Sequence, residues 1–582
     1  MIKPRSPLPW LAGFFCLLLA TIAPPVAGQP APDEKTAPAA KLDSNQPIDE
    51  LFRAWNRPDS PGAAVAVVDH GKIVYEKGFG CANLEYGIPI KPDTIFHVAS
   101  VSKQFTAMAV VLLEQDGKLS IEDDVHKYLP ELPDYGHPLT LRNLLQHTSG
   151  IRDQWETLAL AGWDSRDVIT QDQILRLLFR QKELNFPPGT RWLYSNGGFT
   201  LLAEVVKRAS GQPLPQFCAE RIFGPLGMSH SHFHLELEEI VPNRAYSYEI
   251  GDHGFAFAPL NYANVGATSL FTTAGDLARW LDNFREPKVG HQAAIARLEE
   301  VGVLSSGKKT GYALGLDVGT YRGLRTISHD GGDAGYRATV LWFPDQQMGI
   351  AIVSNLGEFN PGALAREVAD LLLASAFTKP KAPERVAPHH EAIKIDPVLF
   401  DKFVGSYESD GTAGFILTYT REGDRFYTQA VGQPRFEMLP ESESTFFIKD
   451  FDAQVTFPTD PNGKVTRLIH HQGGRDYPAH RIATSSEDEK DLAEFTGAYW
   501  SEELETQYTF FLKDGRLCGV HAHHGEFSLG RGTGDNFRTS LDFISEAQFI
   551  RDAAGKITGV KLGGDRVAGI YFMRKPASAD KR

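Results

Sequence analysis

The sequence predicts an α+β domain followed by two small antiparallel β-barrel or sandwich domains. Three observations support this fold class: two apolar hairpins border a mostly helical region, a proline-rich segment ends that region, and the remainder is a β-rich tandem repeat. The chain has 582 residues, which is too long for one hydrophobic core, so several domains are expected.

The first predicted domain covers residues 47–378. Apolar runs at 63–68 and 73–79 are joined through Asp69-His70-Gly71-Lys72, which indicates a β-hairpin. A second pair of runs, at 338–343 and 349–353, turns through a polar tetrapeptide. The pattern between the hairpins is mostly helical, and residues 361–376 form a closing amphipathic helix. Terminal strands with helices between them are typical of one antiparallel sheet covered by helices, an α+β domain.

The C-terminal part of the chain is a duplication. A linker at 379–395 is indicated by three prolines between residues 380 and 390. Beyond it, Phe403-Val404-Gly405-Ser406-Tyr407 recurs 92 residues later as Phe495-Thr496-Gly497-Ala498-Tyr499, and Phe457 recurs at the same distance as Phe549. Each copy consists of short alternating runs separated by turn residues. We therefore expect two β domains, at 396–484 and 488–576.

The N-terminal residues have the pattern of a secretory leader. Lys3 and Arg5 give a positive start, residues 10–23 are apolar, and Val26-Ala27-Gly28 is a suitable cleavage site. The sequence thus predicts a signal peptide at 1–28 and a flexible spacer at 29–46. No other segment is long and apolar enough to span a bilayer. The mature protein is expected to have no membrane span and to be exported, either periplasmic or secreted.

The charge of the chain narrows the class of partner. The formal net charge is -14, which leaves no basic surface on which nucleic acid would bind. A small molecule or a peptide is the expected substrate, and no cofactor is predicted. The oligomeric state is left open.

The first candidate catalytic pair is Ser100 with Lys103. Acyl-transfer hydrolysis needs a hydroxyl made nucleophilic by a nearby base, and residues three apart on a helix lie on one face. Ser100 opens a predicted helix that is apolar on most of its surface and ends at Gly117, so this helix is expected to be central and buried. Ser305 with Lys308 and Ser306 with Lys309 show the same spacing, but they lie in a polar stretch without a helical pattern.

Two further motifs follow in order along the chain. Tyr194-Ser195-Asn196 precedes a helical pattern, and His329-Asp330-Gly331-Gly332 lies just ahead of the strand that begins at 338. With Ser100-Val101-Ser102-Lys103, these motifs resemble the three conserved elements of the serine β-lactamases and penicillin-binding proteins. The resemblance covers residues 48–376 and is strongest to the class C-like branch, which includes esterases and D-aminopeptidases. A second Tyr-x-Asn, Tyr262-Ala263-Asn264, has different surroundings.

The resemblance implies a β-lactamase-like catalytic domain and a role for each motif. Ser100 would be the nucleophile, and Lys103 and Tyr194 would share the role of base. Asn196 would bind the substrate amide, while His329 and Gly331 belong to the triplet that borders the substrate. The backbone N–H groups of Ser100 and Gly332 would form the oxyanion hole, because the residue after the triplet has that place in the family.

The triplet departs from the family's Lys-Thr-Gly. His329 replaces the lysine and is largely neutral near pH 7, and Asp330 adds a negative charge that would repel a substrate carboxylate or bind a free amine. Within the family, His-x-Gly resembles the D-aminopeptidases and esterases, and the former also carry two β-barrel domains. The prediction is an exported D-stereospecific aminopeptidase. The alternatives are an esterase, a β-lactamase or DD-carboxypeptidase-like enzyme, and a non-catalytic penicillin sensor or wall-binding protein.

Other histidines are expected to be structural. His147, in the loop Leu-Gln-His-Thr-Ser-Gly, is predicted to bond backbone near the pocket. Histidines alternate at 230–234 and cluster at 521–524, but no carboxylate or cysteine with ligand spacing completes either set. These histidines are therefore predicted to be solvated, and no metal site is expected.

Overall fold

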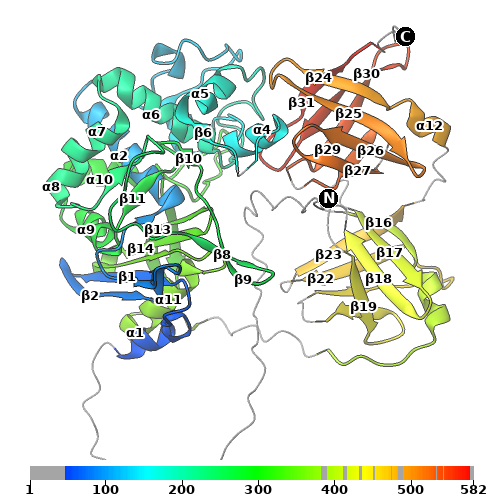
Figure 1. The fold of residues 1–582 in the computed structure, drawn as a ribbon, viewed down its shortest axis with the longest axis horizontal. Coiled ribbons are helices and arrows are strands. Elements are labelled where there is room, and N and C mark those ends of the chain that lie inside the picture. The colour runs from blue at the N-terminus through cyan, green and yellow to red at the C-terminus, as the bar shows by residue number, and fades with distance from the viewer. Residues whose placement is uncertain are drawn as a thin grey trace, which may run out of the picture. The chain divides into compact units, whose positions relative to one another are not determined.

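The computed structural model describes residues 46–164, 166–381, 390–410, 416–430, 435–449, 453–472, 475–482, 489–532, 534–541 and 543–576. The predicted leader, residues 29–45 of the predicted spacer and residues 382–389 of the predicted linker lie outside these ranges. The described residues form two compact units: one contains 46–158 and 166–381, and the other contains 159–164 and the residues from 390 onward (Figure 1). No helix in the described ranges is long and apolar enough to cross a membrane.

The first unit is built on an antiparallel sheet of six strands in the order β12-β13-β14-β15-β1-β2. The strands are β1 (Ala63–Asp69), β2 (Lys72–Phe79), β12 (Asp317–Tyr321), β13 (Leu324–Asp333), β14 (Tyr336–Phe343) and β15 (Met348–Ser354). Both predicted hairpins are confirmed. They meet in the middle of the sheet, where Ala63 lies opposite Ser354, so the two ends of the domain close one sheet.

The turn of the first hairpin follows from its sequence. His70 has φ +46° and Gly71 has φ +81°, so both central residues have the positive φ of a type I′ turn. Glycine adopts this conformation without steric cost, and the turn's twist matches that of the strands it joins. The β1 side chains from Ala63 to Val68 are all buried, as expected for a strand with both faces covered.

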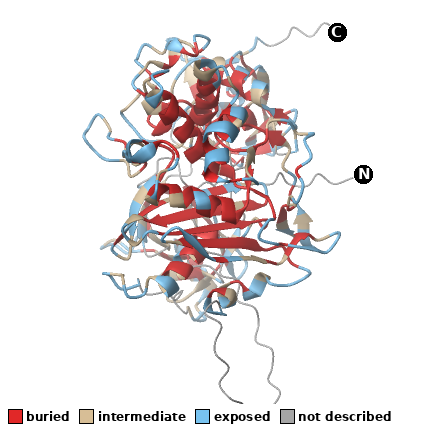
Figure 2. Cartoon of the chain, turned by 90° about the vertical axis from the view of Figure 1, so that its left-hand side faces the viewer, coloured by how far each residue is buried: buried red, intermediate tan, exposed pale blue. Residues whose placement is uncertain are grey.

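Helices cover both faces of this sheet. On one face α11 (Pro361–Leu372) packs on β14 and β15, and α1 (Gln46–Leu51) packs on α11; on the other, α9 (Ala274–Arg285) packs on β1 and β15 (Figure 1). Figure 2 shows the strands and the helix surfaces beside them as largely buried. The other helices are α2 (Lys103–Gln115), α3 (Leu141–Leu145), α4 (Gln154–Leu160), α5 (Gln171–Phe179), α6 (Asn196–Ser210), α7 (Leu214–Cys218), α8 (Gly224–Leu226) and α10 (His291–Leu298).

The predicted central helix is confirmed, but it begins later than expected. Ser100 lies in a 3₁₀ turn, η2 (Ala99–Ser102), and the α-helix α2 starts at Lys103. Every residue of α2 from Lys103 to Leu113 is buried, because α6, α7 and α10 pack around it. A helix without a polar face can only be stable in such surroundings.

A short three-stranded sheet leads into η2. It consists of β5 (Phe96–His97), β11 (Leu270–Thr272) and β7 (His232–Phe233), with β11 in the centre. The backbone N–H of Val98 donates to the Leu270 carbonyl, and the N–H of Leu270 donates to Oγ of Ser102 at 3.1 Å. The strand β11 therefore holds η2 from both of its ends. The remaining short strands of this unit pair as β3 (Cys81–Asn83) with β4 (Ile88–Pro89), β6 (Ile169–Thr170) with β10 (Tyr262–Ala263), and β8 (Tyr248–Gly251) with β9 (Gly254–Phe257).

The C-terminal duplication forms two closed eight-stranded antiparallel barrels. The sequence left barrel and sandwich open, and the structure shows barrels. The first contains β16 (Gly405–Ser409), β17 (Ile416–Glu422), β18 (Arg425–Ala430), β19 (Phe436–Pro440), β20 (Thr445–Ile448), β21 (Ala453–Thr456), β22 (Arg467–Gln472) and β23 (Arg475–Ile482). The second follows the short helix α12 (Glu489–Ala493) and contains β24 (Gly497–Ser501), β25 (Thr506–Lys513), β26 (Arg516–His521), β27 (Gly525–Arg531), β28 (Asn536–Thr539), β29 (Glu546–Arg551), β30 (Ile557–Gly563) and β31 (Ile570–Arg574).

The repeated residues occupy equivalent places in the two barrels. Tyr407 donates its hydroxyl hydrogen to the Phe403 carbonyl at 3.0 Å, and Tyr499 donates to the Phe495 carbonyl at 2.9 Å. Both tyrosines are fully buried. The same side chain thus forms the same bond, four residues back along the chain, in each copy. A duplication that kept its core chemistry explains why the sequence motif survived in both barrels.

We predict that Tyr407→Phe and Tyr499→Phe each destabilise their own barrel by about 1–2 kcal/mol, because each leaves a buried carbonyl without its donor. Tyr571→Phe is the control, since Tyr571 is 42% exposed and water can replace its hydroxyl. Urea unfolding of the three variants measures the difference. Equal stability of all three would show that the two buried hydrogen bonds contribute nothing.

Candidate active site

The buried amine of Lys103 joins three separate elements. Its Nζ lies 3.0 Å from Oγ of Ser100, 2.8 Å from Oδ1 of Asn196 and 2.7 Å from the carbonyl oxygen of Ala267. These partners come from η2, from the first residue of α6 and from the segment before β11. Lys103 itself is completely buried. The predicted nucleophile, its predicted base and Asn196 are therefore brought together.

Asn196 is held by a carboxylate that the sequence motifs did not reveal. Oδ2 of Asp153 accepts hydrogen bonds from both the backbone N–H and the Nδ2 group of Asn196, each at 2.8 Å. The Asp153 side chain is buried, and its Oδ1 accepts from the N–H of Trp155 at the start of α4. Because Nδ2 points to Asp153, Oδ1 must point to Lys103. No local pattern distinguishes Asp153, which lies three residues after the Leu-Gln-His-Thr-Ser-Gly loop.

Tyr194 lies beside Lys103, and the ring of His147 packs against the Tyr194 ring. The centre of its ring is 5.0 Å from Nζ of Lys103 and 4.2 Å from the centre of the His147 ring. The His147 carbonyl accepts from the N–H of Leu193 at 2.9 Å, and its Nδ1 accepts from the N–H of Ser195 at 3.2 Å. These bonds hold the backbone on both sides of Tyr194. The predicted structural role of His147 is confirmed.

His329 lies ahead of β14, the strand expected from residue 338, as predicted, but it is itself part of a further strand, β13. Its ring is buried; Nδ1 donates to the Asp330 carbonyl at 2.6 Å, so Nε2 accepts from the hydroxyl of Tyr312 at 3.0 Å. Burial lowers the pKa of His329 to about 3, and the nearby charge of Lys103 acts in the same direction. The imidazole is therefore neutral at pH 7, as predicted. Tyr312, also buried, was not identified from the sequence.

Asp330 does not share the face of His329. Its Oδ1 accepts from Oγ1 of Thr339 at 2.6 Å, and it lies next to Gly362 near the start of α11. Successive side chains of a strand point to opposite faces, which explains the separation. The expectation that Asp330 places its charge beside His329, where it could repel a carboxylate or bind an amine, is therefore wrong.

The end of β13 borders Ser100, the predicted nucleophile, directly. A Cβ added to Gly331 would lie 2.2 Å from the Val98 carbonyl oxygen and 3.2 Å from the backbone nitrogen of Ser100, so only glycine permits this approach. The register of β12 with β13 stops where Asp317 pairs with Ser328. Beyond Ser328, the outer edge of β13 therefore has no partner strand among the described residues. Gly332 pairs with Arg337 on the inner side, toward β14. An open edge of this kind can accept an extended substrate.

The competing motifs lie elsewhere and have other roles. All four residues of the two alternative Ser-x-x-Lys pairs, at positions 305, 306, 308 and 309, are exposed. Asn264 of the second Tyr-x-Asn is fully buried, where its Oδ1 accepts from Gln154 and its Nδ2 donates to Gln171. This second motif is part of the scaffold around α4, α5 and α6.

Two of the histidines predicted to be solvated are buried. The His234 side chain is 3% exposed, and His521 is 4% exposed. His521 lies 2.7 Å from the Thr506 hydroxyl through its Nε2. The prediction that no carboxylate accompanies the first histidine group is wrong, because Glu239 lies beside His232 and His234. A loop returns Glu239 to the strand, which spacing alone did not indicate.

We predict that Gly331→Ala destabilises the protein by about 1–3 kcal/mol and lowers kcat/KM, because its methyl group must displace the Val98 carbonyl. Gly332→Ala is the matched control, since its methyl group would meet only the Arg337 side chain, at 3.5 Å. Thermal unfolding compares the two variants. Equal loss of stability in both would contradict the close approach of Gly331 to η2.

His329 is expected to make the folded state sensitive to acid. Its pKa is about 3 in the folded protein and about 6.5 in an unfolded chain, so on acidification the unfolded state binds the proton first. Folding stability should fall by about 2 kcal/mol between pH 7 and pH 5 through this residue alone. His329→Gln should remove that part of the pH dependence in urea unfolding experiments. Equal pH dependence in the variant and the wild type would show that His329 protonates normally.

Comparisons with known proteins show similarity over both parts of the chain. The family model described as Beta-lactamase matches residues 48–375, and a domain of unknown function, DUF3471, matches residues 389–479. Penicillin-binding protein 4* of Bacillus subtilis is 28% identical over 460 residues, which cover 75% of this chain and 98% of that protein. The D-aminopeptidase of Brucella ovis is 28% identical over 546 residues, which cover 88% of this chain and 96% of that protein.

The fold is also found among solved structures. The octameric penicillin-binding protein homologue from Pyrococcus abyssi aligns with a TM-score of 0.54 and 22% identity, over 83% of this chain and 100% of that one. At this identity the match concerns the fold alone. The Beta-lactamase model, however, covers more than half of the chain and includes Ser100, Tyr194 and His329. The chain therefore belongs to the beta-lactamase family and is a serine hydrolase of the penicillin-binding protein type.

Proposed function

We propose that this protein is a D-stereospecific aminopeptidase or amidase that forms an acyl-enzyme on Ser100. The observation that carries the proposal is the extent of the similarity to proteins named D-aminopeptidase. The match to the Brucella ovis protein covers 88% of this chain, which is more than the catalytic domain can supply and must extend into the barrel region. Similarity of the whole architecture favours a shared substrate class over similarity of the nucleophile alone.

Lys103 supplies the base in this proposal. In the neutral form that a base requires, Lys103 would donate its two N–H hydrogens to Oδ1 of Asn196 and to the Ala267 carbonyl, which are acceptors only. The remaining lone pair then points to Oγ of Ser100 at 3.0 Å, within range to accept the hydroxyl proton. Tyr194, with its ring beside Lys103, shares this role. Ser100 thereby becomes nucleophilic and attacks the substrate carbonyl.

Substrate and intermediate would be held at the open edge of β13. The backbone N–H groups of Ser100 and Gly332 would stabilise the oxyanion, which the close approach of Gly331 to η2 supports. Asn196 would donate to the substrate amide, because Nδ2 carries two hydrogens and Asp153 takes one. The amine leaves with a proton from Lys103 or Tyr194. Water directed by Tyr194 then hydrolyses the ester of Ser100.

The neutral imidazole of His329 favours uncharged over anionic substrates. A lysine at this place would offer a permanent positive charge to a carboxylate, whereas His329 has neither a charge nor a free Nε2 in the described site. We accordingly propose D-amino-acid amides and peptides as substrates ahead of β-lactams and carboxylate-terminated peptides. From the leader pattern of the sequence, we propose that the reaction takes place in the periplasm or outside the cell.

A second candidate is a penicillin-binding protein that acylates slowly. It is favoured by one observation, the alignment that covers 98% of penicillin-binding protein 4*. Esterase activity with the same nucleophile is the third possibility, and one experiment with three substrates separates all of them.

We predict that the purified protein hydrolyses D-alanine p-nitroanilide and not the L isomer, and that Ser100→Ala lowers the rate more than about a hundredfold. Ser305→Ala is the matched control, since Ser305 has the same spacing to a lysine but is exposed. Turnover of p-nitrophenyl acetate alone would select an esterase. A stable Ser100 adduct with fluorescent penicillin, seen by mass spectrometry without turnover, would select the penicillin-binding protein. Full activity of Ser100→Ala would overturn the nucleophile assignment.

A further inference from the structure

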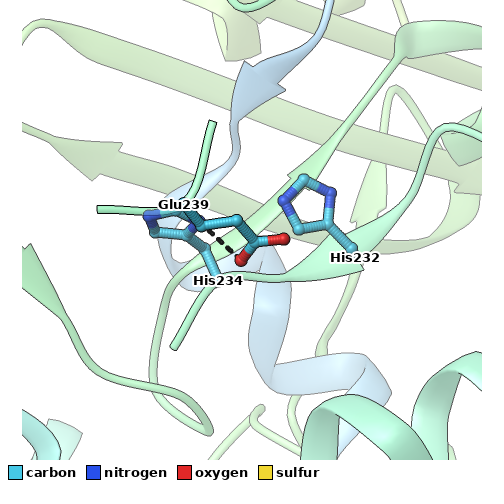
Figure 3. A group of neighbouring side chains, drawn as sticks. All are labelled: His232, His234 and Glu239. Carbon is cyan, nitrogen blue, oxygen red and sulfur yellow. Dashed lines mark ion pairs between the residues drawn. The ribbon is translucent and has the colours of Figure 1, made fainter. Parts of the chain in front are cut away.

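Three side chains outside the active site converge at the end of β7. His232 comes from this strand, His234 directly follows it and Glu239 lies in the loop beyond, and each offers a ligand atom within 4.8 Å of the other two. Nδ1 of His234 lies 3.3 Å from Oε2 of Glu239. Figure 3 shows the Glu239 carboxylate lying between the two imidazole rings.

The strand and its neighbour position the two rings. His232 is the first residue of β7 and His234 directly follows the strand, and the ligand atoms of both rings converge with that of Glu239. Phe271 of β11 lies opposite His232 in the register and packs against both rings, with centre-to-centre distances of 5.7 Å to His232 and 5.2 Å to His234. The imidazoles are therefore held in place by packing and not by hydrogen bonds to each other. Such pre-positioning lowers the cost of binding a ligand.

Both rings present a nitrogen whose hydrogen-bonding capacity is not used. Nε2 of His232 and Nδ1 of His234 are buried and form no hydrogen bond among the described residues; the contact of Nδ1 with Glu239 is an ion-pair distance without hydrogen-bond geometry. The His234 side chain is 97% buried, and an unsatisfied buried polar atom costs about 1–3 kcal/mol. Glu239 is half exposed, so the carboxylate can move and leaves a route from solvent. A buried site with one mobile ligand is well suited to admit an ion.

We propose that His232, His234 and Glu239 bind one divalent transition-metal ion, with Zn²⁺ the best match. Two imidazole nitrogens and one carboxylate oxygen are a donor set that zinc accepts, with a water molecule in the fourth position. Tetrahedral bonds of 2.0–2.2 Å require ligand atoms about 3.3 Å apart. The exposed Glu239 can close the remaining distance, because its side chain is not packed in the core.

The protonation state of the two imidazoles agrees with this assignment. Burial lowers the pKa of His232 and of His234, and the charge of Glu239 opposes this only in part. Burial thus favours the neutral imidazole, the form that binds a metal.

The ion would connect a surface loop to the sheet that supports the nucleophile. His232 is on β7, which pairs with β11; β11 pairs with β5, and β5 leads into η2 with Ser100. Binding of an ion to the folded state alone stabilises that state in proportion to its affinity. We therefore expect Zn²⁺ to raise the thermal unfolding temperature.

The test uses purified full-length protein without a polyhistidine tag, stripped of metal with a chelator. Isothermal titration with ZnCl₂ should show one strong site per chain, and Co²⁺ should give the visible absorption of a tetrahedral complex. Glu239→Gln keeps shape and is exposed, so it should fold normally but bind Zn²⁺ more than about tenfold more weakly. His232→Asn should have the same effect and should also abolish the rise in unfolding temperature.

His230→Ala is the matched control, because His230 is exposed, lies two residues before His232 and is outside the cluster. This variant should bind Zn²⁺ like the wild type. The proposal is overturned if the wild type binds no stoichiometric Zn²⁺. It is also overturned if Glu239→Gln and His232→Asn retain wild-type affinity, since the ion would then be bound elsewhere, for example by the histidines at 521–524.

Discussion

The burial of the Lys103 amine is the constraint on which the catalytic domain depends. A buried amine is tolerated only when acceptors surround it, and here they come from the nucleophile, from Asn196 and from the Ala267 carbonyl. The elements that carry these groups must therefore converge on α2. Asp153 is needed as well. It accepts a hydrogen bond from Nδ2 of Asn196 and so decides which end of the Asn196 amide faces the lysine. A chain that folds correctly around α2 has thereby placed Ser100, the proposed nucleophile, beside Lys103.

The neighbouring strand β13 contributes His329, whose buried imidazole is uncharged, to this arrangement. Lys103 already places one basic group in the site, and burial of His329 keeps a second positive charge out. Tyr312 completes the effect by donating its hydroxyl hydrogen to the His329 ring. The absence of a side chain at Gly331 then lets this neutral edge approach η2. Under the proposed function, the same interactions that stabilise the site would also favour uncharged substrates, which links the fold to the proposed specificity.

The short sheet of β5, β11 and β7 connects the turn that carries Ser100 with the cluster of His232, His234 and Glu239. Its central strand bonds both ends of η2, and its outer strand carries His232 and leads into His234, the two histidines that we assign to a metal ion. Phe271 lies opposite His97 of β5 and opposite His232 of β7 in the register, so its ring contacts a residue of each outer strand. Stability gained at the metal cluster would reach the nucleophile through only two strand pairings.

The sequence by itself determined the fold class, the two hairpins, the buried helix and the duplication, because each depends on a local periodicity or on exact recurrence. It also identified Ser100, Lys103, Tyr194, Asn196 and His329 as candidates, since their motifs follow in order. Only the tertiary structure decided which groups orient them. Asp153, Tyr312 and the Ala267 carbonyl have no sequence signature, and Asp330 changed role because strand alternation turned it to the other face. Glu239 meets His234 through a loop whose path no spacing rule predicts, because contacts between distant segments are set by packing and not by local preference.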